Sequence, residues 1–253
     1  KLFDIFMNKV VILAASKGTR MGSNIPKVIV PIKSKPMIQY LLDSIQSAGI
    51  DPQPIIVVSP DIKEAVQNEL ADYSALYAIQ EKQLGTGHAL QSSYSIIGDS
   101  VETVSVFYGD HPLITPKTMK LLIESHTQSN SPITMMTIQV SDFNDWRVVV
   151  EKWGRIKRNA QGNVCEIIEY KDSTDQDKNI MELNPGLYCF NKKWLFENSH
   201  LLTNNNAQKE FYLTDLITIA CKQGITINDI QIPPQESIGV NTPEERAIAE
   251  GML

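Results

Sequence analysis

The sequence predicts an α/β fold in which a mostly parallel sheet is flanked by helices. In the first half of the chain, apolar runs typical of strands alternate with amphipathic stretches typical of helices, the order expected of parallel strands joined by helical crossovers. In the second half, short strand-like runs are separated by polar turns such as NAQGN. This change of pattern predicts a small β-rich insert over the mouth of the sheet.

The elements of the first half follow from this alternation. Apolar runs predict strands at residues 10–15, 54–58, 104–108 and 131–140. Apolar residues recurring at helical spacing between them predict helices at 36–47, 62–70 and 117–126.

The elements of the second half are shorter. Strands of the insert are expected at 147–157, 162–170 and 186–190. The chain then returns to a helix at 211–221, a strand at 225–232 and a terminal helix at 242–251. Thr242 can cap that last helix, because Pro243 follows at its first position and Glu245 stands where a capping box requires it.

The bulk composition limits the class of protein. The chain has 253 residues, 42% of them hydrophobic, which is ordinary for a globular protein. No apolar run reaches the ~18 residues of a membrane span, and no secretory signal is visible. Cys165, Cys189 and Cys221 are odd in number and widely spaced, which favours reduced thiols in the cytoplasm. A net charge of -6 argues against nucleic-acid binding. We therefore expect a cytoplasmic protein with neither nucleic-acid nor membrane partners.

The stretch LAASKGTRMGSNIPK, from Leu13 to Lys27, is the first candidate binding site. It follows a predicted strand, and ligands of open parallel sheets bind where such loops leave the sheet. Its small residues allow a close approach of the backbone, and Lys17, Arg20 and Lys27 supply charge for a phosphate-rich ligand. The Walker and GxGxxG patterns are absent. On these residues alone, a plain turn at Ser16 and Gly18 with three solvated cations stays an equal alternative.

Further segments of the sequence favour a binding site over a plain turn. LAASKGTRM…PK resembles the signature of the sugar nucleotidyltransferases, and QEKQLGTGHAL, YGDHPLI, GRIKR, IIEYKD, ELNPGLY, NNNAQKEFYLTDLI and GVNTPEE follow in the order seen in bacterial N-acetylglucosamine-1-phosphate uridyltransferases. The resemblance runs from about Val10 to about Glu245. It implies a Rossmann-like nucleotidyltransferase fold. A single domain is expected at 7–253, with a nucleotide-binding half at about 7–130 and a sugar-binding half at about 131–253. The family's bifunctional members add a hexapeptide-repeat acetyltransferase domain, and no such repeat is present here.

The resemblance also implies a reaction. UMP would pass from UTP to N-acetylglucosamine 1-phosphate, giving pyrophosphate and UDP-N-acetylglucosamine, an activated amino sugar for cell-wall precursors. Such chemistry needs positioning and charge neutralisation, so Mg²⁺ is the implied cofactor. The implied catalytic residues are Arg20, Lys27 and Asp110. The implied metal ligands are Asp110 and Asn241.

The substrate contacts are carried over in the same way. The resemblance implies a nucleotide site formed by Leu13, Ala14, Ala15, Ser16, Lys27, Gln80, Gly85 and Thr86. It implies a sugar site formed by Tyr108, Gly109, Gly154, Glu169, Asn184 and Asn241. A Gln amide can donate and accept at once, as a pyrimidine edge requires. His88 is expected to begin a helix and pack rather than to act as a base.

Other interpretations stay open at this stage. Asp110 could cap the turn before Pro112, and Asn241 could be a turn residue before the Thr242 cap. Ser16 and Pro185 replace residues that are usually glycine and threonine in the family, which affects contacts at both points. Another base or sugar 1-phosphate, or a non-catalytic subunit that binds sugar nucleotides, are the alternative functions. The oligomeric state stays open.

Overall fold

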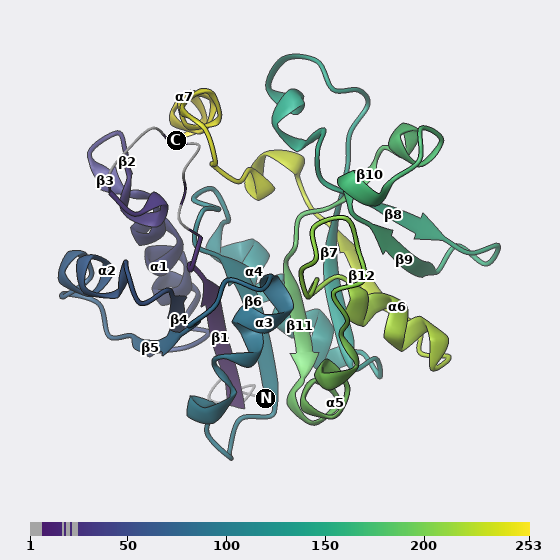
Figure 1. Ribbon diagram of the computed structural model, residues 1–253, viewed down its shortest axis with the longest axis horizontal. Helices are drawn as coiled ribbons and strands as arrows, with labels where there is room; N and C mark the ends of the chain where they lie inside the picture. The colour runs from purple at the N-terminus through teal and green to yellow at the C-terminus, as the bar shows by residue number, and fades with distance from the viewer. Residues whose placement is uncertain (1–6, 17, 19–20, 22–24) are drawn as a thin grey trace.

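The first half of the chain forms a parallel sheet built around its first strand. A computed structural model describes residues 7–16, 18, 21 and 25–253. In it, β1 (Asn8–Leu13) pairs with β4 (Ile55–Val58) on one side and β6 (Thr103–Tyr108) on the other. β5 (Leu76–Ile79) continues the sheet beyond β4, also in parallel. The carboxyl ends of these strands therefore meet at one edge (Figure 1).

Helices cover both faces of this sheet. Val10 and Ile12 of β1 pack in a core cluster with α1 (Met37–Ala48), α2 (Lys63–Glu69) and α4 (Pro116–Gln128), whereas Val11 and Leu13 pack on the opposite face. That second face is covered by α3 (Thr86–Gln91), α5 (Lys192–Asn198) and α6 (Asp215–Lys222). Side chains alternate between the faces of a strand, so a strand buried on both faces reads as a continuous apolar run. The predicted parallel α/β fold is confirmed.

One strand of the second half belongs to the central sheet and not to the insert. β11 (Tyr188–Asn191) lies between β6 and β7 (Ile133–Gln139) and is antiparallel to both. Placing residues 186–190 in the insert was therefore wrong. Tyr188, Cys189 and Phe190 are fully buried, as expected of a strand with helices on both faces. β12 (Asn228–Gln231) runs parallel to β7.

The insert itself is antiparallel. It consists of β8 (Gly154–Arg158), β9 (Val164–Ile168) and β10 (Glu182–Asn184), and β10 joins it to β7. The strand predicted at 147–157 is wrong over its first part, where the chain forms the 3-10 helix η5 (Asp145–Val150). Val150 is fully buried but Val148 is exposed, so only part of this apolar run packs into the core. The pairing of β8 with its neighbours begins only at Gly154.

The remaining elements are short or terminal. Near the first loop lie the 3-10 helix η3 (Lys27–Ile29) and the two-stranded ribbon of β2 (Pro31–Ile32) and β3 (Lys35–Pro36). Other 3-10 turns are η4 (Tyr94–Ile96), η6 (Tyr170–Asp172), η7 (Asp177–Asn179), η8 (Ser199–Leu201) and η9 (Pro234–Ser237). The terminal helix α7 (Pro243–Met252) has the predicted capping box of Thr242 and Glu245. No helix in the described part of the chain is long and apolar enough to cross a membrane.

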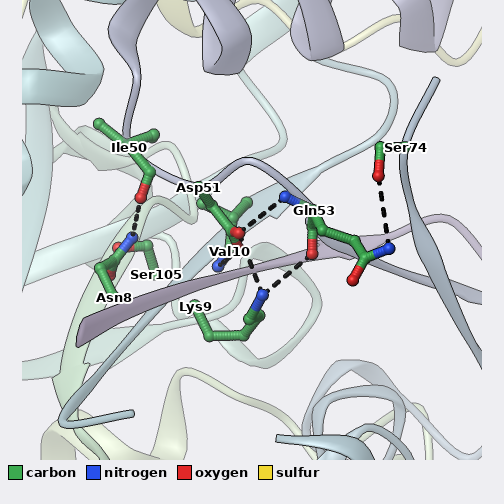
Figure 2. Close-up of polar contacts among 8 residues, drawn as sticks. All are labelled: Asn8, Lys9, Val10, Ile50, Asp51, Gln53, Ser74 and Ser105. Atoms are coloured by element: carbon green, nitrogen blue, oxygen red, sulfur yellow. Dashed lines mark hydrogen bonds and ion pairs between the residues drawn. The ribbon is translucent and has the colours of Figure 1, made fainter. Parts of the chain in front are cut away.

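A polar network secures the other end of β1, away from the carboxyl edge. Asp51 accepts hydrogen bonds from the backbone nitrogen of Val10 at 2.8 Å and of Gln53 at 3.0 Å, and its carboxylate pairs with Lys9 at 3.0 Å (Figure 2). The Asn8 side chain lies on the face of the sheet opposite to that of Lys9. Its Oδ1 accepts a hydrogen bond from Ser105 of β6 at 2.8 Å, and its Nδ2 donates to the Ile50 carbonyl at 3.3 Å. These bonds tie the start of β1 to the segment that leads into β4.

Candidate functional site

A cavity of about 360 Å³ opens at the carboxyl ends of β1 and β6, and we call it the first cavity. Parallel strands present their loops at this edge, which is why loops distant in sequence meet here. The eight residues expected to contact a nucleotide all line it: Leu13, Ala14, Ala15, Ser16, Lys27, Gln80, Gly85 and Thr86. Arg20, expected to be catalytic, and Lys17 lie outside the described residues.

The wall around Gly85 is held by a distant segment. Phe211 donates its backbone N–H to the Leu84 carbonyl at 2.8 Å and accepts from Gly87 N at 2.8 Å. Gly85 has φ +112°, and a Cβ there would lie 2.6 Å from the Phe211 carbonyl oxygen. Only glycine adopts this conformation without strain and fits this gap. The backbone at this point is therefore fixed before any ligand binds.

The orientation of the Gln80 amide is set by its neighbours. Gln80 is 3% exposed, and its Nε2 donates to the Gly85 carbonyl at 3.1 Å. A carbonyl can only accept, so the amide nitrogen must face it. The second proton of Nε2 points at His88 Nδ1, 3.1 Å away. Both donors of this amide are therefore engaged, and Oε1 is the atom left to meet a ligand. His88 lies in α3 and supports Gln80, in line with the expectation that it packs.

Lys27, Asp110 and Asn241 meet beside the first cavity. The Lys27 ammonium forms an ion pair with Asp110 and donates to Asn241 Oδ1 at 2.9 Å. Both partners of the ion pair are largely buried, with side chains 6% and 14% exposed. Burial is the largest single influence and by itself would raise the pKa of Asp110, but the charges of Lys27 and His111 and the hydrogen bonds to the carboxylate together outweigh it, so the pKa is lowered. Three residues far apart in the sequence thus form one charged cluster.

Local structure explains why the cluster forms. The backbone nitrogen of Val240 donates to the Asp110 carbonyl at 2.9 Å, which holds the segment GVN beside the end of β6. Glu245 of α7 accepts from Thr242 N at 3.1 Å and also from Asn241 N. The capping box of α7 therefore also fixes the backbone from which Asn241 reaches Lys27.

A second cavity, of about 250 Å³, adjoins the first and lies toward the insert. Tyr108, Gly154, Glu169 and Asn184, all expected to contact a sugar, line it. Asp110, Thr86, Tyr108 and Glu210 line both cavities, so the two meet at Asp110. Gly109 and Asn241, also expected at the sugar, line neither. Gly109 packs against Ala14 and Val28, and Asn241 faces Lys27.

The second cavity contains a carboxyl with an altered pKa. Burial raises the pKa of Glu169, a hydrogen bond from Thr214 Oγ1 at 2.9 Å opposes this rise, and nearby acids such as Asp215 add to it. A carboxyl that protonates easily can donate as well as accept, which suits a ligand rich in hydroxyl groups. Pro185 also lines this cavity, where the neighbouring Gly186 N donates to Asn184 Oδ1 at 3.1 Å.

Several lining residues were not expected from the sequence. Gln83 donates to the Ala15 carbonyl from across the first cavity, and Glu210 lines both cavities. His111 and Trp153 form one wall of the second cavity, with parallel rings 5.9 Å apart. The conspicuous segments QEKQLGTGHAL and NNNAQKEFYLTDLI contain Gln83 and Glu210, so these two could have been found. Nothing in the sequence marks the pairing of His111 with Trp153.

Asp110 and Asn241 could hold a divalent cation. Their side-chain oxygens converge on one positive group, the Lys27 ammonium, which shows that both can face a cation at the same point. A carboxylate and an amide oxygen are ligands that Mg²⁺ accepts, and this ion keeps several waters and needs few protein ligands. The residues present therefore fit magnesium.

The fold brings two adjoining cavities to the carboxyl edge of a mostly parallel sheet, and comparisons with known proteins identify the family of the chain. The profile of the MobA-like NTP transferase domain matches residues 10–208. The chain is 38% identical over 244 residues to the bifunctional protein GlmU of Clostridium novyi (strain NT) and 40% identical to that of Geobacillus sp. (strain WCH70). Each alignment covers 96% of this chain and 51% of the relative. The chain belongs to the MobA-like NTP transferase family.

Two further comparisons extend this result. GlmU of Desulfotalea psychrophila (strain LSv54 / DSM 12343) is 36% identical, with 96% of this chain and 70% of the relative aligned. A solved structure from Bacillus anthracis, provisionally described as a glucose-1-phosphate thymidylyltransferase in complex with sucrose, superposes with a TM-score of 0.76. It covers 97% of this chain and 94% of its own, at 18% identity, and supports the fold alone. The chain spans about half the length of the first two relatives.

Proposed function

We propose that this protein transfers UMP from UTP to N-acetylglucosamine 1-phosphate, forming UDP-N-acetylglucosamine and pyrophosphate. The observation that carries the proposal is the meeting of two cavities at Asp110, one lined by the expected nucleotide contacts and one by most of the expected sugar contacts. A nucleotide and a sugar phosphate bound there would meet phosphate to phosphate. Membership of the NTP transferase family and the GlmU relatives support the same assignment.

The roles of the residues follow from charge. A sugar 1-phosphate is already an anion and needs no general base before it attacks the α-phosphorus of the nucleotide. The obstacle is repulsion between two anions, which positioned cations reduce. Lys27 is the described cation at the meeting point, and releasing Asp110 would turn its ammonium to the phosphates. Asp110 and Asn241 would hold magnesium, which would supply charge neutralisation and orientation of the phosphates.

Selection of the base rests on Gln80. With both amide protons engaged, Oε1 is an acceptor and suits the N3–H of uracil. Cytosine presents an unprotonated N3 and would place two acceptors against each other. Thymine presents the same N3–H as uracil. Gln80 would therefore discriminate between UTP and CTP, and discrimination against dTTP would depend on the pocket around Gly85.

The test is pyrophosphate release with Mg²⁺ and a panel of substrates. We expect turnover with UTP and N-acetylglucosamine 1-phosphate and little with glucose 1-phosphate. Equal or faster turnover of glucose 1-phosphate overturns the sugar assignment, and faster turnover of CTP, GTP or dTTP overturns the base. Nucleotide binding without any pyrophosphate release would support the alternative of a non-catalytic subunit.

A further inference from the structure

Arg155 is a buried cation that the proposed reaction does not use. It is 1% exposed, and among the described residues no carboxylate lies within the 4.0 Å of an ion pair. Its Nη1 donates to the Trp153 carbonyl at 2.7 Å and its Nη2 to the Lys178 carbonyl at 3.5 Å, while Nε is buried without a partner. A buried charge is costly unless it is paired, so this arrangement calls for an explanation.

Two aromatic rings take the place of a counterion. The guanidinium carbon lies 5.0 Å from the ring centroid of Phe143 and 5.3 Å from that of Tyr170. Aromatic faces attract a cation most strongly when water is excluded. Phe143 precedes η5 and Tyr170 begins η6, so the guanidinium holds two separate connecting segments against strand β8.

These two segments supply walls of the second cavity. Arg155 is preceded by Trp153 and Gly154, and Tyr170 is preceded by Glu169; all three of these preceding residues line the cavity. Arg155 pairs with Ile168 across β8 and β9, so the contributions of Trp153, Gly154 and Glu169 lie side by side. The Trp153 ring in turn stacks on His111, the residue after Asp110. Arg155 therefore contacts both segments that carry Trp153, Gly154 and Glu169 on this wall.

We propose that Arg155 is a positioning residue for the sugar 1-phosphate, clamping the Trp153 and Tyr170 segments so that Trp153, Gly154 and Glu169 face the bound sugar. The inference rests on the proposed function, because it assigns the sugar to the second cavity. The proposed effect is selective for one cavity. Loss of the Arg155 contacts would loosen the second cavity and leave the first unchanged, because the first is built from β1, η3 and α3.

The same strand provides a matched control. Arg158, three positions further along β8, forms ion pairs with Glu182 at 2.5 Å and Asp229 at 2.6 Å and lines neither cavity. Arg158→Met therefore removes an arginine and its contacts from the same strand without touching the clamp. Arg155→Lys keeps the buried charge but lacks the planar fork that reaches two carbonyls at once.

The experiment compares Arg155→Met, Arg155→Lys and Arg158→Met in steady-state kinetics and in calorimetric binding of N-acetylglucosamine 1-phosphate. We expect Arg155→Met to raise KM for the sugar phosphate roughly 10- to 100-fold, the size of effect that misplaced substrate contacts give, and to leave KM for UTP within about twofold. Arg155→Lys should fall between it and wild type. Arg158→Met should lower the melting temperature without changing the ratio of the two KM values.

Other outcomes overturn the inference. An unchanged sugar KM in Arg155→Met, an equal rise in both KM values, or the same selective rise in Arg158→Met would each show that Arg155 has a structural role only. If Arg155→Met does not fold, the same criteria apply to Arg155→Lys. A wild-type protein that binds the sugar phosphate without turnover contradicts the proposed function, while the dissociation constants of the variants still decide the role of Arg155. A wild-type protein that does not bind it overturns both.

Discussion

The Lys27 ammonium lies between Asp110 and Asn241, in ion-pair contact with the first and 2.9 Å from Oδ1 of the second. These two partners are the residues expected to hold Mg²⁺. A metal ion held by these oxygens would therefore compete with Lys27 in the free protein, and the lysine would have to move before the metal could bind between them.

Removing Lys27 should strengthen metal binding in the absence of nucleotide. We expect Lys27→Met to bind Mn²⁺ at least about tenfold more tightly than wild type, because a like charge near the site is worth more than the ~1.4 kcal/mol of a tenfold change. Electron paramagnetic resonance of free Mn²⁺ measures this directly. Lys152→Met, which removes an exposed lysine of the second cavity, is the control and should bind Mn²⁺ as wild type does. Unchanged or weaker binding by Lys27→Met would contradict competition.

Asp110→Asn should separate the proposed catalytic role of this carboxylate from its structural role. Turnover should fall on the order of 100- to 1000-fold, as for loss of one electrostatic element. Stability should also fall, by about 3 kcal/mol or more, because Lys27 is left as a buried cation without its counterion. The double variant Lys27→Met/Asp110→Asn should regain much of the stability and none of the turnover. Recovery of turnover in the double variant would show that Asp110 acts only by pairing with Lys27.

Gln80→Leu should weaken discrimination between bases. Loss of one buried hydrogen bond to the base costs about 1–1.5 kcal/mol, so kcat/KM for UTP should fall by roughly tenfold while that for CTP changes less. Gln91→Leu, on the outer part of α3, is the control because Gln91 bonds to Ser199 away from the cavity. An unchanged ratio of UTP to CTP turnover in Gln80→Leu would remove Gln80 from base selection.

Asp51→Ala should destabilise the fold and leave catalysis intact. The change leaves Lys9 and the N–H groups of Val10 and Gln53 without their carboxylate, in the network of Figure 2. Breaking a buried pair typically costs about 3–5 kcal/mol. Urea unfolding should report this loss, while KM for both substrates stays at the wild-type value because the network lies at the opposite end of β1. A change in either KM would mean that the two ends of this strand are coupled.

His126 should make stability depend on pH. Burial lowers its pKa from 6.5 to about 4. Between these pH values the unfolded chain binds a proton that the folded protein does not, so the free energy of unfolding falls as the pH drops from about 6.5 to 4, by up to ~3 kcal/mol. His126→Gln cannot take up this proton and should show a flatter profile in urea titrations at each pH. Identical slopes for the two proteins would exclude His126 as the cause.

Much of the fold could be predicted from the sequence because strands buried on both faces consist of continuous apolar runs. The predicted strands match β4 and β6 to within one residue at each end and β1 to within two, and the cap of α7 is identified from Thr242 and Glu245. β5 was missed because it is only partly buried, and α3 was expected only as a helix beginning at His88, two residues late, because its six residues are too few to show a period. The order of strands in a sheet depends on tertiary pairing, which is why the place of β11 was mistaken.

Only part of the candidate site could likewise be predicted from the sequence. The loop residues of the first cavity could be named in advance because the resemblance to the sugar nucleotidyltransferases implies them, whereas the loop by itself left a plain turn as an equal alternative. The contact of Lys27 with Asp110 and the isolation of Arg155 could not, because both arise from side chains brought together by packing between segments that are distant in the sequence.

The place of β11 also sets the order in which the sheet can be completed on the ribosome. β6 is made early, but one of its two edges stays unpaired until α4, β7 and the whole insert have been synthesised. Throughout that interval the nascent chain exposes a strand edge of the kind that promotes association between chains. β11 must then enter between two strands that already exist, antiparallel to both. Any fragment that stops before residue 188 should therefore aggregate rather than fold into a smaller nucleotide-binding unit.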